Sequence, residues 1–172
     1  MNKTINTLIH RRSCRSYLDK EVPEELIEQI VEAGLYAPTG RGSQGDAVIV
    51  ITNKEVRDEL EKQNAAVMGR EGASPFYGAP VVLLVIASGP LGVYDGSCMI
   101  SNMMNAATSL GLGSCWIHRA YEECQEGYGR QLLKEAGYGE EYYGIGHMIL
   151  GYPAGEFPKP QARKEGRVSY FK

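Results

Sequence analysis

The hydrophobic residues of this chain follow two spacings, one helical and one strand-like. Apolar side chains recur every three or four positions after Pro23, which suits a first helical turn, and Glu24 and Glu25 suit the positive end of that helix. Ala37-Pro38 ends the pattern. The same spacing predicts further helices at residues 4–9, 54–68, 95–110 and 126–136.

Short apolar runs between these helices predict buried strands at residues 47–52, 81–87, 111–118 and 143–150. The run at 81–87, VVLLVIA, is apolar at every position, as in a strand covered on both faces. Helices and strands alternate without a regular βα unit, so we expect an α+β fold rather than a doubly wound sheet. Prolines at positions 153, 158 and 160 disfavour a helix in the C-terminal tail.

The helix expected at residues 95–110 is apolar around most of its circumference. One small sheet is too narrow to cover such a helix, so we expect a C2 homodimer in which two copies of it meet. The extended tail would then cross to the partner subunit, where residues 168–171 could add an edge strand.

Length and charge narrow the classes of function. The 172 residues, 43% of them hydrophobic, predict one domain over residues 1–172. The net charge of -3 gives no field that would gather nucleic acid or an anionic membrane, and no apolar run is long enough to span a bilayer. The N-terminal segment has the wrong order for a secretory signal. We therefore expect a cytoplasmic protein with small-molecule ligands, no nucleic-acid partner and no membrane partner.

The residue types that carry nucleophilic catalysis or metal binding form no recognisable set. The four cysteines include no CxxC pair and the three histidines lack metal-ligand spacing, so we expect buried thiols and no metal site. His147 lies in an apolar strand and is expected to be a hydrogen-bonded core residue. No Ser/His/Asp or Cys/His signature is present.

A dinucleotide-binding pattern occurs but lacks its structural context. Gly40, Gly42 and Gly45 spell GxGxxG, a motif that requires a strand before it and a helix after it. Here a helix precedes the glycines and a strand follows them, so a Rossmann site is excluded.

Basic residues gather near the N-terminus. Arg11, Arg12 and Arg15 surround Ser13, and guanidinium groups with a hydroxyl can donate several hydrogen bonds to one phosphate monoester. The alternative is a solvated turn between two helices. A second basic cluster, Arg163, Lys164 and Arg167, lies in the tail and is less specific.

Five segments, in order along nearly the whole chain, resemble the FMN-dependent nitroreductase family. They are RRSCRSY, APTGRGSQGDAVIVIT, GAPVVLLVIA, SNMMNAATSLGLGSCWI and ILGYPAGEFPKPQARK. The resemblance implies a nitroreductase-like fold with a mostly antiparallel sheet flanked by helices. It also implies a homodimer that exchanges its C-terminal tails and binds FMN.

The resemblance assigns this chain's residues to the two ends of the flavin. Arg11 and Ser13 match positions that contact FMN, and Arg15 matches a cation at the polar edge of the ring. The tail cations that match phosphate-binding positions are Arg163 and Lys164. Arg12 and the retained Gln44 complete the cofactor-binding set on these segments.

Two further segments match positions that face the flavin ring. The partner subunit would contribute Pro38, Thr39 and Gly40, while Ile117, His118 and Arg119 would present backbone N–H groups to flavin N5. His118 is also a candidate proton donor to the substrate. The sequence departs from the family pattern where Gly42 replaces an Asn and where Gly45-Asp46 replaces Pro-Trp.

The implied activity is two-electron transfer from NADH or NADPH, through flavin N5, to a small acceptor such as a nitroaromatic or a quinone, with ping-pong kinetics. The sequence does not choose between the two donors. Two alternatives stay open. One is a flavin enzyme of the same fold with different chemistry, such as a reductive dehalogenase or a flavin-fragmenting enzyme. The other is an FMN-binding carrier or sensor with little turnover.

Overall fold

A four-stranded antiparallel sheet with the order β1-β2-β4-β3 forms the centre of the protein. The computed structural model describes residues 1–172. The strands are β1 (Asp46–Ile51), β2 (Val81–Ala87), β3 (Gly113–Ile117) and β4 (Tyr143–Gly151). All three neighbouring pairs are antiparallel, which confirms the α+β class expected from the sequence.

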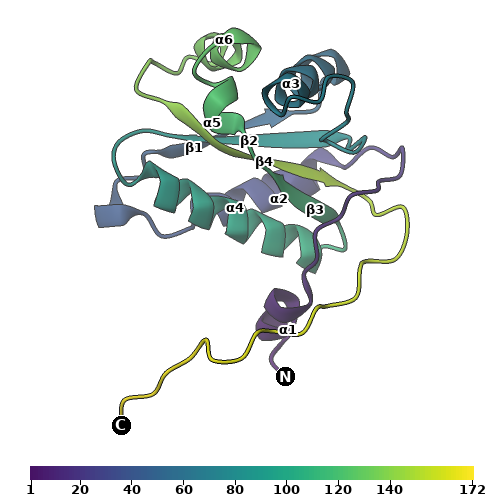
Figure 1. Ribbon diagram of the computed structural model, residues 1–172, viewed down its shortest axis with the longest axis vertical. Coiled ribbons are helices and arrows are strands. Elements are labelled where there is room, and N and C mark those ends of the chain that lie inside the picture. The colour runs from purple at the N-terminus through teal and green to yellow at the C-terminus, as the bar shows by residue number, and fades with distance from the viewer.

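Helices cover both faces of this sheet (Figure 1). On one face lie α3 (Lys54–Val67), α5 (Ala120–Glu123) and α6 (Gly127–Glu135), and on the other lie α2 (Glu24–Leu35) and α4 (Gly92–Ser109). The 3-10 helix η1 (Gly40–Gly42) connects α2 to β1, and α1 (Lys3–His10) contacts α4. The tail beyond β4 runs away from the sheet as an extended chain (Figure 1).

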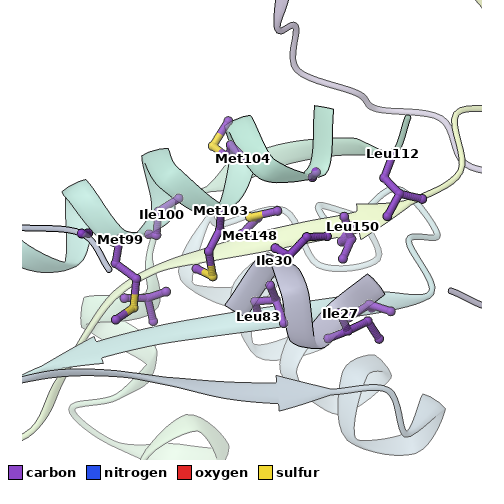
Figure 2. Close-up of a cluster of buried hydrophobic side chains, with 14 of the residues drawn as sticks. Ile27, Ile30, Leu83, Met99, Ile100, Met103, Met104, Leu112, Met148 and Leu150 are labelled. Carbon is purple, nitrogen blue, oxygen red and sulfur yellow. The ribbon is translucent and has the colours of Figure 1, made fainter. Parts of the chain in front are cut away.

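Two hydrophobic clusters share strand β2. All seven of its residues are buried: its odd-numbered side chains join the cluster packed by α2 and α4, and its even-numbered side chains join the cluster beneath α3, α5 and α6. Figure 2 shows the first cluster, which includes Ile27, Ile30, Leu83, Met99, Ile100, Met103, Met148 and Leu150. The VVLLVIA pattern is therefore explained by burial on both faces.

Most predicted boundaries agree with the structure to within one or two residues. The exceptions are α4, which begins at Gly92 rather than at residue 95, and the short elements η1 and α5, which the periodicity did not indicate. Glycine is a poor helix former, so the periodic pattern became visible only after the first turn of α4. Gly92 is required there because a Cβ would lie 2.5 Å from the Tyr143 hydroxyl oxygen.

The surface of α4 differs from the sequence expectation. Its large apolar residues, including Met99, Ile100 and Met103, are buried within the chain because α2 packs beside the sheet on the same face. The side chains left outward over most of its length are small and polar, such as Ser101 and Asn105. The premise that one chain leaves the apolar stripe of this helix uncovered is thus wrong.

Exposed hydrophobic side chains gather elsewhere. Leu35, which the periodicity placed on the apolar face of α2, is 57% exposed. Three regions hold most of the exposed large hydrophobic residues, namely α1, the surroundings of η1 with the start of α4, and the tail: Ile5, Leu8, Ile9, Leu35, Tyr36, Leu91, Val93, Tyr94, Phe157, Val168, Tyr170 and Phe171. The others, Met1, Leu18, Val50, Val67, Tyr77 and Tyr121, are scattered over the rest of the chain. These three regions, rather than the middle of α4, offer apolar surface to a partner.

Strand β4 carries a register shift opposite the Val85/Ile86 step of β2, where Val85 pairs with Gly146 and Ile86 with Gly144. This irregularity brings β4 close to α5. A Cβ on Gly144 would lie 2.0 Å from the backbone oxygen of Ala120, and backbone cannot move aside as a flexible side chain can.

Replacing Gly144 with alanine should therefore destabilise the protein. We expect Gly144→Ala to lower the free energy of unfolding by about 3 kcal/mol, the upper end of ordinary overpacking, and to lower Tm by roughly 6–12 °C for a chain of this size. Gly155→Ala is the matched control because no atom lies within 4 Å of a Cβ there. Equal melting temperatures for the two variants would contradict this account of the bulge.

Candidate functional site

The N-terminal basic segment is anchored to the start of β3. Ser13 forms a parallel bridge with Ser114, and the Cys14 N–H donates to the Ser114 carbonyl at 2.9 Å. The buried Cys14 packs so closely on Gly113 that a Cβ on that glycine would lie 2.7 Å from the sulfur. Because alternate residues of an extended segment point to opposite sides, burial of Cys14 turns Ser13 and Arg15 outward.

The first two arginines of this segment have different surroundings. The Arg12 side chain donates from Nη1 to the carbonyls of Ile9 and Arg11, at 2.8 and 2.6 Å, and so caps the C-terminus of α1. Arg11 Nη1 is buried and has no hydrogen-bond partner, and nor does the buried hydroxyl of Ser114. A buried guanidinium nitrogen without an acceptor is suited to an anion such as a phosphate.

Arg15 shares a cavity of about 490 Å³ with the end of β3 and the loop that follows α3. The structure thus brings together Arg15, Ile117, His118 and Arg119, all of them predicted cofactor-binding residues. No carboxylate lines this cavity. Its full lining is Arg15, Met68, Arg70, Ala73, Ser74, Pro75, Tyr77, Cys115, Trp116, Ile117, His118 and Arg119. Cations combined with aromatic and apolar surface suit a flat, electron-accepting ligand with a polar edge.

A buried polar network lies behind this cavity. Arg119 has a left-handed backbone (φ 80°), and its Nε donates to Asn64 Oδ1 at 3.1 Å. Asn64 Nδ2 donates to the His118 carbonyl at 2.9 Å and to Glu123 Oε2 at 3.0 Å. His147 Nε2 lies 2.5 Å from the same Glu123 oxygen, which confirms His147 as a hydrogen-bonded core residue. Sequence reasoning missed Asn64 and Glu123, because a polar residue in an amphipathic helix carries no signal that it points inward.

The segment from Pro38 to Gln44 lies at the start of α4. The Gly40 N–H donates to Asp95 Oδ1 at 2.9 Å, and the Gln44 N–H donates to Thr39 Oγ1 at 3.2 Å. Burial, with a smaller contribution from the Asp95 charge, raises the pKa of the neighbouring Asp46. The hydrogen bond from the Gly40 N–H to the Asp95 carboxylate, in the first turn of α4, fixes the position of η1.

The two halves of the predicted site are far apart within one chain. Gly40 is bonded to the first turn of α4, whereas Cys14 is bonded to Ser114, beyond the last turn of that helix. The 18 residues of α4 span about 27 Å. The structure therefore does not bring Pro38, Thr39, Gly40 and Gln44 into contact with the N-terminal basic segment of the same chain.

The tail leaves the sheet beside Arg15. The Ala154 N–H donates to the Ser16 carbonyl at 3.0 Å and the Leu18 N–H donates to the Tyr152 carbonyl at 2.9 Å. Beyond this pairing, a cavity of about 240 Å³ separates the segment Ser13–Ser16 from the tail residues Gly155–Pro158. Arg163 and Lys164 are exposed.

Three of the four cysteines lie in the interior. Cys14, Cys115 and Cys124 are buried, as expected, whereas Cys98 is exposed. Burial raises the pKa of Cys124 to about 12, which keeps that thiol protonated and unreactive. The structure contains no group of three His, Cys, Asp or Glu side chains arranged to hold a metal ion, and none of its helices has the length and apolar character that crossing a membrane requires.

Comparison with known proteins gives consistent results. An FMN reductase [NAD(P)H] of Bacillus subtilis is 26% identical over 195 aligned residues. The match covers 99% of this chain and 74% of that protein. A solved nitroreductase with bound FMN from Bacteroides fragilis superposes with a TM-score of 0.90 at 28% identity and full coverage of both chains.

A protein of Methanothermobacter thermautotrophicus, whose name pairs NADH dehydrogenase with NAD(P)H nitroreductase, is 34% identical over 152 residues. The match covers 84% of this chain and 74% of that protein. The model of the Nitroreductase family matches residues 8–152, from α1 to the end of the sheet. The chain belongs to the nitroreductase family.

Proposed function

We propose that this protein is an FMN-dependent oxidoreductase that takes an electron pair from NADH or NADPH and passes it to a small acceptor such as a nitroaromatic or a quinone. One observation carries the proposal: Arg15 and the turn Ile117–Arg119 line one cavity, in a chain of this family. The FMN-bound nitroreductase of Bacteroides fragilis, which has the same fold along its whole length, supports FMN as the cofactor.

The phosphate end of FMN would lie at the N-terminal basic segment. The unpartnered Arg11 Nη1 supplies a buried donor, and Ser13 lies next to it on the outward side of the segment. Charge-assisted hydrogen bonds of this kind are about twice as strong as neutral ones. Arg163 and Lys164, from a C-terminal tail, would supply the remaining cations around the phosphate. Arg12 would contribute less, because its Nη1 is committed to the carbonyls at the end of α1, while its buried Nε, like Arg11 Nη1, has no partner.

The ring end would lie in the 490 Å³ cavity. FMN, when bound, supplies an N5 atom that accepts a hydride and passes the electron pair on. Arg15 stabilises the negative charge that the reduced ring carries at its polar edge. The backbone N–H groups of the turn Ile117–Arg119 would orient the ring, and the exposed His118 side chain would give a proton to a substrate above it.

A homodimer would unite the two halves of the site. Thr39 and Gly40 lie beside the first turn of α4, whereas the basic segment is bonded to Ser114, beyond the last turn of that helix, so a second copy of the chain would have to bring the same residues close to it. The exposed hydrophobic residues of α1, of the η1 region and of the tail supply apolar surface for such a contact.

The tail would lie across the partner subunit. β1 is an edge strand, and between it and α2 lies a groove of about 960 Å³. Glu21, Glu24 and Glu28 line this groove together with Val50 of β1. The tail is basic and extended, and it ends in exposed apolar residues at 168–171, so its charge and shape complement an acidic groove beside a free strand edge.

The proposed activity predicts a yellow protein that bleaches with its donor. The purified protein should show flavin absorbance, release FMN rather than FAD on heating, and lose colour anaerobically when NADH or NADPH is added. Air or a quinone should then restore the colour. Absence of flavin after incubation with excess FMN would reject the proposal, and retained colour with neither donor active would instead support the carrier or sensor alternative.

Arg15 and Arg12 should differ in their effect on the flavin. Arg15→Ala is expected to lower the two-electron midpoint potential by about 30–60 mV, because a charge-assisted hydrogen bond of roughly 1.5–3 kcal/mol to the reduced ring is lost. Arg12→Ala should weaken α1 and leave the potential nearly unchanged. Spectroelectrochemical titration measures the midpoint potentials of both variants, and equal shifts of the two potentials would show that Arg15 does not contact the ring.

Removal of the tail should abolish both the dimer and the binding of FMN. A chain that stops after Gly155 keeps the pairing of Tyr152–Ala154 with Ser16–Leu18, so its sheet should fold. We expect it to sediment as a monomer and to lose FMN. The full-length double variant Arg163→Gln/Lys164→Gln should stay dimeric and bind FMN more weakly. A truncated monomer that retains FMN would contradict the shared site.

A further inference from the structure

Helix α3 carries a polar face that holds both walls of the ring cavity. On one side, Glu61 Oε1 accepts from Ser74 Oγ at 2.7 Å and from the Phe76 N–H at 2.6 Å, in the loop that lines the cavity. On the other side, one turn further along α3, Asn64 is bonded to both residues of the His118–Arg119 turn. Asn64 is fully buried and does not line the cavity itself.

All of the contacts of the Asn64 side-chain amide agree on one orientation. The carbonyl oxygen of Asn64 must face Arg119, because Nε is only a donor, and the amino group must face the His118 carbonyl and the Glu123 carboxylate, because both only accept. The Glu123 carboxylate is itself fixed by His147 on β4. The amide is therefore held from three directions and cannot rotate without losing contacts.

Arg119 needs such support because of its backbone conformation. A φ of 80° is unfavourable for a residue with a Cβ, costs of order 1–3 kcal/mol, and persists only where the surroundings enforce it. The bond from Arg119 Nε to Asn64 fastens the side chain inward, and the bond from Asn64 to the His118 carbonyl fixes the peptide plane between the two residues. That peptide plane carries the N–H of Arg119, whose direction at the cavity wall follows from it.

We propose that Asn64 is a positioning residue for the flavin: by holding the His118–Arg119 peptide, it aims the Arg119 N–H at the ring and so sets the reduction potential. This inference rests on the proposed FMN site. Fixed donors stabilise a charge that develops in front of them more than mobile donors do, since they need no reorganisation. The network His147–Glu123–Asn64 is then the support of that turn rather than a proton path.

The test compares variants on the FMN-loaded protein. Asn64→Ala should lower the two-electron midpoint potential by about 30 mV, which corresponds to a tenfold change in the relative affinity for reduced and oxidised FMN. It should also slow flavin reduction by the nicotinamide. Gln63→Ala is the matched control: Gln63 lies beside Asn64 on α3 and bonds Glu123 O, Glu126 O and Gly129 N, but neither residue of the turn. Its variant should lose thermal stability and keep the potential.

A second pair of variants serves if Asn64→Ala does not fold. Glycine adopts positive φ without strain, so Arg119→Gly should preserve the turn and shift the potential less than Arg119→Ala, which keeps the strain and loses the bond. The inference is overturned if Asn64→Ala lowers Tm but leaves the potential unchanged, or if Gln63→Ala shifts it equally, or if the two Arg119 variants behave alike. Absence of FMN from the unmodified protein would instead overturn the proposed function.

Discussion

Strand β2 is apolar on both faces, and this single property determines how the rest of the chain must fold. One layer of helices cannot bury the side chains on both faces of this strand, so each face of the sheet requires its own layer of helices. The chain supplies α2 and α4 for one face and α3, α5 and α6 for the other. Apart from Ile117 at the end of β3, the predicted site residues lie in connections between this sheet and one of the two layers, or in extensions beyond them.

The connections carry the backbone strain of the molecule. Four residues other than glycine have positive φ: Arg41, Gln44, Tyr77 and Arg119. Tyr77 and Arg119 line the ring cavity, and the other two lie in the segment around η1 that the partner would present. Left-handed conformations at such residues persist only where the surroundings fix them. Their restriction to these two places fits a protein whose packed layers hold a ligand site in a fixed shape.

Periodicity predicted the parts of the fold that burial determines. The strands and the long helices were recognisable because each has a face that must be apolar, and the antiparallel sheet agrees with the family resemblance. Neither η1 nor α5 has such a face, and Asn64 and Glu123 are buried by hydrogen bonding rather than by hydrophobicity. The predicted residues near Arg15 line one cavity. The residues around Gly40, which the resemblance assigns to the flavin of a partner subunit, lie at the first turn of α4, and that assignment stays a prediction.

The departure at position 42 changes a side chain while it preserves the backbone. Gly42 has a φ of 65° and nothing lies within 4 Å of the place where its Cβ would be. Asn, the residue that the family resemblance leads one to expect there, is the other residue that commonly adopts this left-handed conformation. Replacing Asn with Gly therefore leaves the turn between Thr39 and Gln44 intact and removes only an amide group. A contact from position 42 to a flavin in the partner subunit would then depend on its backbone groups, in a segment that the bond between Gly40 and Asp95 holds in place.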